Sequence, residues 1–279
     1  MPPNHLSRLK NNKSMHWDPT SNILTVETPH ALIQAVGYLK YALRQHGPVL
    51  FRGQNKLYPS MTPSLFRSIK TTGGMSEREK KVIEYTRLAT TSGAFIGKMP
   101  SDALEPLLQH YGIKTRWIDL VDNAWTALWF ACQNSLSTGP ISQYLHFAPS
   151  ESENAYIILM QGGQETTEAN KPGFLTSKNS IIIDLRRATP STYLRPHAQH
   201  GLLLRRRAYS EPEHMDLSDF VVGIICAKTA KAKDWLGFGA LTATHHIFPP
   251  PYYDEGYRAF LKRAPLGTSV IGSIQHIGA

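Results

Sequence analysis

A chain of 279 residues, 41% hydrophobic and 18% charged, is long enough to bury a large core, and this composition excludes a disordered protein. No apolar run approaches the roughly 18 residues of a membrane-spanning helix, which excludes that class of protein. The formal net charge of +9 favours partners that carry phosphate groups.

The ends of the chain and its cysteines indicate a cytoplasmic protein. Residues 1–20 are polar and aperiodic, so we predict a mobile N-terminal tail. They also lack the apolar stretch of a secretory signal. Cys132 and Cys226 are far apart and each lies in an apolar run, which favours buried thiols over a disulfide.

The first predicted elements are a strand, a helix and a second strand. Residues 22–26 are typical of a short strand. Residues 28–45 carry apolar side chains at helical spacing, with Thr28 as the N-cap and a proline at the first helical position. A Gly-Pro pair ends this helix, and residues 49–53 predict a buried strand that ends in a turn.

The middle of the chain is predicted to be mainly helical. Ser76 and Glu79 resemble the capping pair at the start of a helix. The expected elements here are helices at 76–92, 103–111 and 123–134, with a strand at 115–120.

The second half is predicted to be richer in strands. Residues 162–174 read as a polar loop, and residues 265–279 as a C-terminal tail. The expected elements are strands at 155–160, 180–185, 201–204, 221–227 and 245–248, and helices at 230–236 and 253–263. Since the alternation of strands and helices is irregular, we predict one α+β domain over residues 21–264, a mixed, mostly antiparallel sheet with packed helices.

Several common catalytic signatures are absent, among them the phosphate loop GxxxxGK[ST], GxGxxG, GxSxG, HExxH and paired CxxC. His197 and His200 are close in sequence, and His245 and His246 are adjacent, but no cysteine or carboxylate stands at a useful spacing. Adjacent histidines on a strand would also point to opposite faces. We therefore expect no metal site.

The first candidate site is the segment Phe51-Arg52-Gly53-Gln54. Arg52 ends an apolar strand, where its planar guanidinium suits a phosphate or a carboxylate. Gly53 permits a tight turn and close approach of the backbone to a ligand. The alternative is a structural ion pair between Arg52 and Asp119 or Asp122.

The second candidate site runs from Gln109 to Asp119. Strand alternation places Thr115, Trp117 and Asp119 on one face. His110 and Asp119 supply a possible base, and Tyr111 a stacking ring. The alternative for His110, which precedes a helix-ending glycine, is a structural role.

The third feature is a basic window between Arg186 and Arg207. It contains six arginines, two histidines and no acid. Such a window favours a phosphate backbone, and the alternative is a solvated surface. The residues predicted to contact nucleic acid are Arg195, Arg205, Arg206 and Arg207.

These segments together resemble the FRG-domain family. The first family signature is matched by residues 51–54, Tyr58 and residues 63–67, the second by residues 109–119 and 123–131, and the third by residues 198–202. The resemblance extends from about residue 31 to about residue 263 in the same order and spacing. Trp117 and the Leu120-Val121 pair depart from the family pattern, at positions expected to line the site.

The layout is also similar, more weakly, to that of ADP-ribosyltransferases. In that fold a first-strand arginine grips NAD, so the resemblance gives this role to Arg52. Gln199 stands where those enzymes have an acid, and a glutamine cannot act as a carboxylate base, which leaves Asp119 or His110 to supply the charge. The implied catalytic residues are Arg52, His110, Asp119 and Gln199, and the implied NAD-binding residues are Phe51, Gly53, Gln54, Tyr58, Tyr111, Thr115, Arg116 and Trp117.

The resemblances imply an NAD-dependent ADP-ribosyltransferase that modifies a macromolecule, as a toxin or phage-defence effector. The basic window makes RNA or DNA the favoured acceptor. A neutralising antitoxin or partner protein fits such a role. Two alternatives stay open: a non-enzymatic module that senses a nucleotide or binds nucleic acid, and an enzyme that hydrolyses NAD with water as acceptor.

Overall fold

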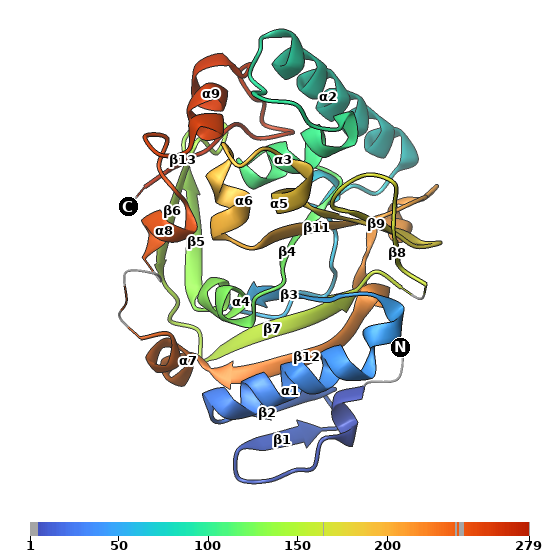
Figure 1. Ribbon diagram of the computed structural model, residues 1–279, viewed down its shortest axis with the longest axis vertical. Coiled ribbons are helices and arrows are strands. Elements are labelled where there is room, and N and C mark those ends of the chain that lie inside the picture. Colours follow the sequence, from blue (N-terminus) through green and yellow to red (C-terminus); the bar gives the residue numbers. More distant parts are fainter. Residues whose placement is uncertain (1–4, 164, 238, 240–242, 279) are drawn as a thin grey trace.

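A computed structural model describes residues 5–163, 165–237, 239 and 243–278 (Figure 1). Its main sheet has ten strands in the order β1 (Met15–Asp18), β2 (Ile23–Val26), β12 (Val221–Lys228), β7 (Asn154–Gln161), β3 (Val49–Gln54), β4 (Ile118–Val121), β11 (Gly201–Arg206), β10 (Ser180–Asp184), β9 (Phe174–Thr176) and β8 (Thr167–Glu168). All neighbouring strands in it are antiparallel except β2 and β12. The predicted α+β class with a mixed, mostly antiparallel sheet is confirmed.

A smaller sheet of three strands joins β13 (His276–Ile277), β6 (Tyr144–Pro149) and β5 (Gln133–Thr138). The helices are α1 (Pro29–Ala42), α2 (Thr72–Thr91), α3 (Leu104–His110), α4 (Ala124–Ala131), α5 (Leu185–Ala188), α6 (Leu194–Ala198), α7 (Thr229–Leu236), α8 (Thr244–Ile247) and α9 (Glu255–Arg263). In Figure 1, α1 lies beside β2 and β12 at one end of the molecule, and α2, α3 and α9 gather at the other. Among the described helices, none is long and apolar enough to cross a membrane.

The central strand β3 has a buried apolar residue on each face. Phe51 belongs to the core that α1 and α4 cover, whereas Leu50 packs on the opposite face with Ile118 and Met160. A third core lies below α2, α3 and α9. Since both faces of the sheet are covered, β3 runs through the interior of the molecule to its end at Gln54.

Both expected tails are folded where the structure describes them. Leu6 is fully buried, and β1 pairs with β2. Ile271 and Ile274 are buried near the other end, and β13 adds to β6. These segments are too short to show a periodic pattern, and they are ordered by distant partners. Residues 1–4 and 279 lie outside the described residues.

Helix starts were predicted with mixed success. Thr28 caps α1, as predicted, by accepting the Ala31 N–H at 3.2 Å. The predicted capping pair of α2 is wrong. Thr71 caps this helix, and Ser76 and Glu79 lie inside it.

Two predicted strands are wrong, and β5 and β6 are among the strands that escaped prediction. The strand expected at 115–120 begins only at Ile118, and residues 245–248, expected as a strand, largely form the short helix α8. Helix α4 ends at Ala131, and β5 with β6 follows where a longer helix was expected. Most of β5 is exposed, so it lacks the apolar alternation that marks a half-buried strand.

Candidate functional site

The candidate site opens where β3 and β4 separate. The two strands pair at Phe51 and Val121. Just beyond this pair, the Arg52 Nη1 donates to the carbonyl oxygen of Asp119 at 2.8 Å, so the arginine side chain joins the strands where their backbone pairing ends. Burial lowers the pKa of Arg52, and the nearby Asp119 carboxylate partly offsets this. Arg52 nevertheless stays a cation at neutral pH.

A cavity of about 270 Å³ lies against this junction. Its polar lining includes the four residues predicted to be catalytic, namely Arg52, His110, Asp119 and Gln199. Three phenylalanines, Phe130, Phe147 and Phe248, contribute apolar walls. Arg52 also lines two neighbouring hollows of about 320 and 540 Å³, so it stands at the centre of a larger cleft.

Gln109 fixes the Asp119 carboxylate in place. The Gln109 Oε1 accepts from the N–H and the hydroxyl of Thr115, at 3.1 and 2.6 Å, which orients the amide. Its Nε2 therefore points to Asp119 and donates to Oδ2 at 2.8 Å. This contact leaves the Asp119 side chain 45% exposed, so a ligand can reach the carboxylate.

His110 is a buried, neutral neighbour of Asp119. Its ring packs against Gly201, where a Cβ would lie 2.3 Å from Cε1. Its Nε2 lies 3.8 Å from Asp119 Oδ1, and neither ring nitrogen has a hydrogen-bond partner among the described residues. Burial lowers the pKa of His110 to about 4, although Asp119 opposes this shift. The negative charge in the cavity at neutral pH therefore comes from Asp119 alone among the predicted catalytic residues.

Gln199 reaches the cavity from the C-terminal end of α6. It is buried, and its Nε2 donates to the Ile247 carbonyl at 3.0 Å. This bond holds the amide nitrogen away from a ligand. Gln199 precedes β11, which begins at Gly201.

The residues predicted to bind NAD divide into two groups. Phe51 and Gly53 line the cavity itself, while Gln54, Tyr58 and Trp117 line the neighbouring hollows. Gly53 has a packing role as well, because a Cβ there would lie 1.8 Å from the Ala127 carbonyl oxygen on α4.

The second group lies away from the cavity. Tyr111 is fully buried, and its hydroxyl donates to Asp254 Oδ2 at 2.7 Å. Thr115 is also fully buried and bonds Gln109. Arg116 points to Glu105 in a bidentate ion pair, at a different hollow. The predicted alternation failed here because residues 115–117 precede the strand.

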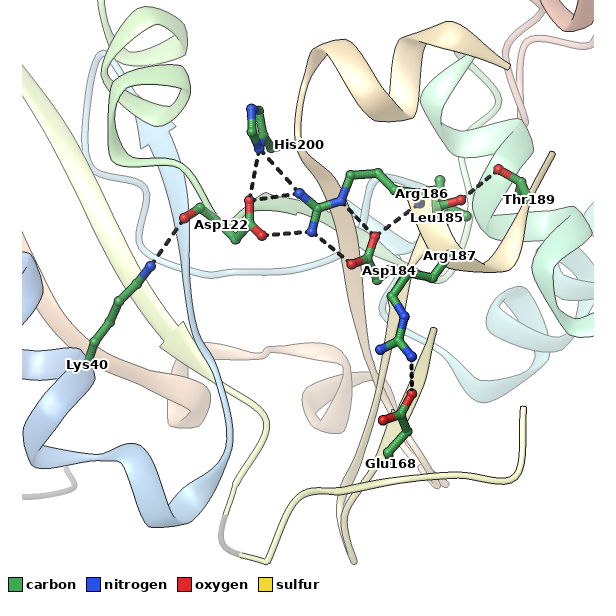
Figure 2. Close-up of polar contacts among 9 residues, drawn as sticks. All are labelled: Lys40, Asp122, Glu168, Asp184, Leu185, Arg186, Arg187, Thr189 and His200. Carbon is green, nitrogen blue, oxygen red and sulfur yellow. Dashed lines mark hydrogen bonds and ion pairs between the residues drawn. The ribbon is translucent and has the colours of Figure 1, made fainter. Parts of the chain in front are cut away.

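Three of the six arginines in the basic window pair with acids from outside it, and Figure 2 shows two of them, Arg186 and Arg187. The Arg186 Nη2 contacts Asp122 Oδ2 at 2.7 Å and Asp184 Oδ2 at 2.8 Å. His200 Nδ1 lies 3.3 Å from the Asp122 carboxylate. Arg187 pairs with Glu168 at the edge strand β8. The hydrogen bonds that Arg186 donates to Asp184 and then to Asp122 outweigh burial and raise the pKa of Arg186.

The four arginines predicted to contact nucleic acid have different environments. Arg195 is 1% exposed and lines the cavity, so it does not lie on a surface where it could contact nucleic acid as predicted. Arg206 pairs with Asp219 at 2.6 Å. Arg205 is half-buried over the Trp117 ring, and only Arg207 of the four is exposed.

Sequence reasoning missed part of the lining. Phe147 comes from the unpredicted strand β6, and Phe130 of α4 was not among the predicted site residues. The role of Gln109 could have been found, because this residue lies within the second family signature. No sequence signal pointed to Phe147. Among the described residues, no group of three His, Cys, Asp or Glu side chains is placed to hold a metal ion.

Comparison with known proteins identifies one part of the chain. The family model described as FRG domain matches residues 47–139. This range contains Arg52, His110 and Asp119, together with β3, β4, α3 and α4. Searches of curated proteins and of solved structures found no match to the chain.

Proposed function

We propose that this chain, which contains an FRG domain, transfers ADP-ribose from NAD to a macromolecule, with nucleic acid as the favoured acceptor. The observation that carries the proposal is the cavity in which a cation, Arg52, and an anchored carboxylate, Asp119, lie together beside a neutral histidine. A dinucleotide needs a positive group for its phosphates and a negative group near the ribose that loses nicotinamide.

Asp119 is the residue that suits bond cleavage. When the glycosidic C–N bond breaks, its electron pair goes to the nicotinamide nitrogen and the ribosyl carbon becomes an oxocarbenium-like cation. The ionised Asp119 stabilises that cation. A nucleophilic oxygen or nitrogen of the acceptor then bonds to the ribosyl carbon and releases a proton, for which Asp119 is a base within the same cleft.

The neutral residues around Asp119 favour substrate positioning. His110 adds no positive charge beside Asp119, since its pKa of about 4 leaves it uncharged at neutral pH. Gln199 is held by Ile247 at its amide nitrogen, and an amide can hydrogen-bond a ribose hydroxyl. The phenylalanine walls suit a flat aromatic ring such as nicotinamide or adenine.

The size of the cleft accommodates a dinucleotide in several parts. Ligand sites typically measure about 300–1,000 Å³. The cavity of about 270 Å³ shares Arg52 as a lining residue with the hollows of about 320 and 540 Å³, so the reacting ribose and the rest of NAD would occupy different parts.

The hollow of about 540 Å³ has the chemistry of a nucleic-acid contact. Lys56, Arg67 and Tyr58 line it, all three exposed, and the Lys56 Nζ lies 5.1 Å from the centre of the Tyr58 ring. Exposed cations beside an aromatic ring suit phosphates and stacked bases. This hollow, rather than the basic window in which Arg186 is paired with acids, is the place proposed for an RNA or DNA acceptor.

A second candidate is a non-enzymatic module that senses a nucleotide or binds nucleic acid. The observation that favours it is Gln199, which stands in the place of an acid and is bonded to Ile247. Hydrolysis of NAD differs from the first proposal only in using water as the acceptor.

The biological role proposed is a toxin or phage-defence effector in the cytoplasm, with a neutralising antitoxin or partner protein. Expression of the wild-type chain is then expected to inhibit growth, and Arg52→Ala to relieve the inhibition. Equal growth with both chains would contradict a toxic activity of this site.

The direct test uses purified protein and NAD labelled on its adenine side. Cellular RNA, DNA or protein is added in separate reactions, and nicotinamide release and macromolecule-bound label are both measured. Transfer of label to RNA or DNA is expected, with a loss of about a hundredfold or more in Arg52→Ala and little change in the exposed Arg87→Ala. Label on protein instead would overturn the proposal that nucleic acid is the acceptor. Nicotinamide release without bound label would indicate hydrolysis of NAD. No release of nicotinamide would favour the non-enzymatic module.

A further inference from the structure

Arg195 is a cation in the interior of the protein. It is 1% exposed, and its guanidinium carbon lies 4.3 Å from the centre of the Tyr111 ring and 4.5 Å from that of Tyr257. A third ring, Phe248, lies at 5.4 Å. These rings stabilise the charge through their π faces and use none of its hydrogen-bond donors.

Most of the donors of Arg195 are not used by the described residues. Nη1 donates to the carbonyl oxygen of His110 at 2.7 Å. Nε and Nη2 have no hydrogen-bond partner there, and no carboxylate of those residues lies within ion-pair distance. Asp254, the buried acid beside it, is engaged with the backbone N–H of Arg195 and with Tyr111.

An arrangement of this kind is costly without a ligand. A buried donor on a charged group that lacks a partner destabilises the folded state, so such a group in a cavity is a candidate for contact with a ligand. Nε and one terminal nitrogen form the edge of a guanidinium that binds two oxygens of one phosphate or carboxylate.

Arg195 lines the same cavity as Arg52 and Asp119. Among the described lining residues these are the charged groups, because His110 is neutral at pH 7. Two arginines against one carboxylate leave the cavity with an excess of positive charge. The net charge of +1 favours an anionic ligand, and a diphosphate offers the two guanidinium groups more oxygens than a single carboxylate does.

We propose that Arg195 forms an anion subsite at the inner end of the cavity, where Nε and Nη2 hold a phosphate of a nucleoside diphosphate. The inference rests on the proposed function in taking a dinucleotide as the natural ligand, but it concerns binding and not cleavage. In this arrangement Arg52 and Arg195 hold the diphosphate between them, and Asp119 remains free to face the ribose.

The test is a calorimetric titration of the full chain with ADP and, separately, with adenosine. Wild-type protein is expected to bind ADP far more tightly than adenosine. Arg195→Lys keeps the charge but loses the two-nitrogen edge, and we expect it to bind ADP about tenfold to a hundredfold more weakly. Arg87→Lys, at an exposed position on α2, is the matched control and should bind as wild type does.

A second measurement observes the contact in the wild-type protein. The Nε–H signals of arginine are observed by NMR during the ADP titration, and the Arg195 signal is assigned by its loss in Arg195→Lys. A large shift of this signal with ADP and none with adenosine supports the subsite. Unchanged affinity in folded Arg195→Lys, an unmoved Arg195 signal, or no binding of ADP by wild type would each overturn it. If ADP binds through Arg195 but no nicotinamide is released from NAD, the proposed subsite stands and only the proposed transferase activity is contradicted.

Discussion

Arg186 and Arg195 come from the neighbouring short helices α5 and α6 but have opposite surroundings. Arg186 bonds two carboxylates, Asp122 and Asp184, in the network of Figure 2. Arg195 is enclosed by aromatic rings in the interior and keeps two nitrogens unpaired among the described residues. The sequence treats both as members of one basic window. Their partners come from distant segments, so the difference belongs to the tertiary structure.

This contrast separates structural charge from functional charge. A cation with all its donors bonded to acids holds parts of the chain together, whereas an unpaired cation in a cavity is available to a ligand. Four changes test the contrast, from the interior to the surface.

The largest effect is expected at Asp254. Its carboxylate accepts from the Tyr111 hydroxyl and from the backbone N–H groups of Arg195 and Tyr257, at 2.7, 3.1 and 2.8 Å. Asp254→Ala leaves these buried donors without a partner, and we expect a loss of about 3–5 kcal/mol in the free energy of unfolding. Urea denaturation measures it, and a loss below about 1 kcal/mol would show that the interior is not organised around this carboxylate.

The next effect is the pH dependence that His110 causes. Its folded-state pKa of about 4 lies below its ordinary value of 6.5, so the unfolded chain binds the proton more readily. This contribution to stability is complete above pH 6.5 and is lost as pH falls towards 4, by up to about 3 kcal/mol.

The measurement is the free energy of unfolding from pH 7 to pH 4 for wild type and His110→Gln. The variant is expected to lose less stability over this range. Parallel curves for the two proteins would mean that His110 does not remain neutral in the folded state.

A smaller effect is expected from Gly201→Ala. The added Cβ would lie 2.3 Å from the His110 ring, so the ring must move within the cavity. We expect a loss of about 1–3 kcal/mol and weaker nucleotide binding. Gly37→Ala, on the exposed face of α1 with no atom within 4 Å, is the control and should stabilise by up to about 1 kcal/mol. Equal effects of the two changes on stability and nucleotide binding would show that the position of the His110 ring does not affect the site.

The smallest effect is expected at the surface. Arg187 and Glu168 form an ion pair in which each side chain is about half exposed to solvent. Arg187→Ala should cost less than about 1 kcal/mol and leave nucleotide binding unchanged. Thermal denaturation in low and high salt measures the loss of stability. A marked loss of nucleotide affinity would show that the basic window takes part in binding.

The sequence predicts the class of the fold and the centre of the site for identifiable reasons. The apolar run before Arg52 and the family signature from Gln109 to Asp119 are local patterns, and both lie at the cavity. The signature also contains Tyr111 and Thr115, which are buried. Their side chains bond Asp254 and Gln109, and no local pattern reveals these partners. The same reason explains Arg195, since its aromatic surroundings combine α3, α9 and the segment at Phe248.

The central claim is that the anchored carboxylate of Asp119 supports cleavage of NAD in a cavity that Arg52 makes positive. The most direct measurement is the rate of nicotinamide release for wild type, Asp119→Asn and the exposed control Asp219→Asn, with nucleic acid present. We expect a fall of about a hundredfold or more for Asp119→Asn, with the wild-type rate retained in Asp219→Asn. Equal rates for folded Asp119→Asn and wild type, or no release by any of the three, would contradict the claim.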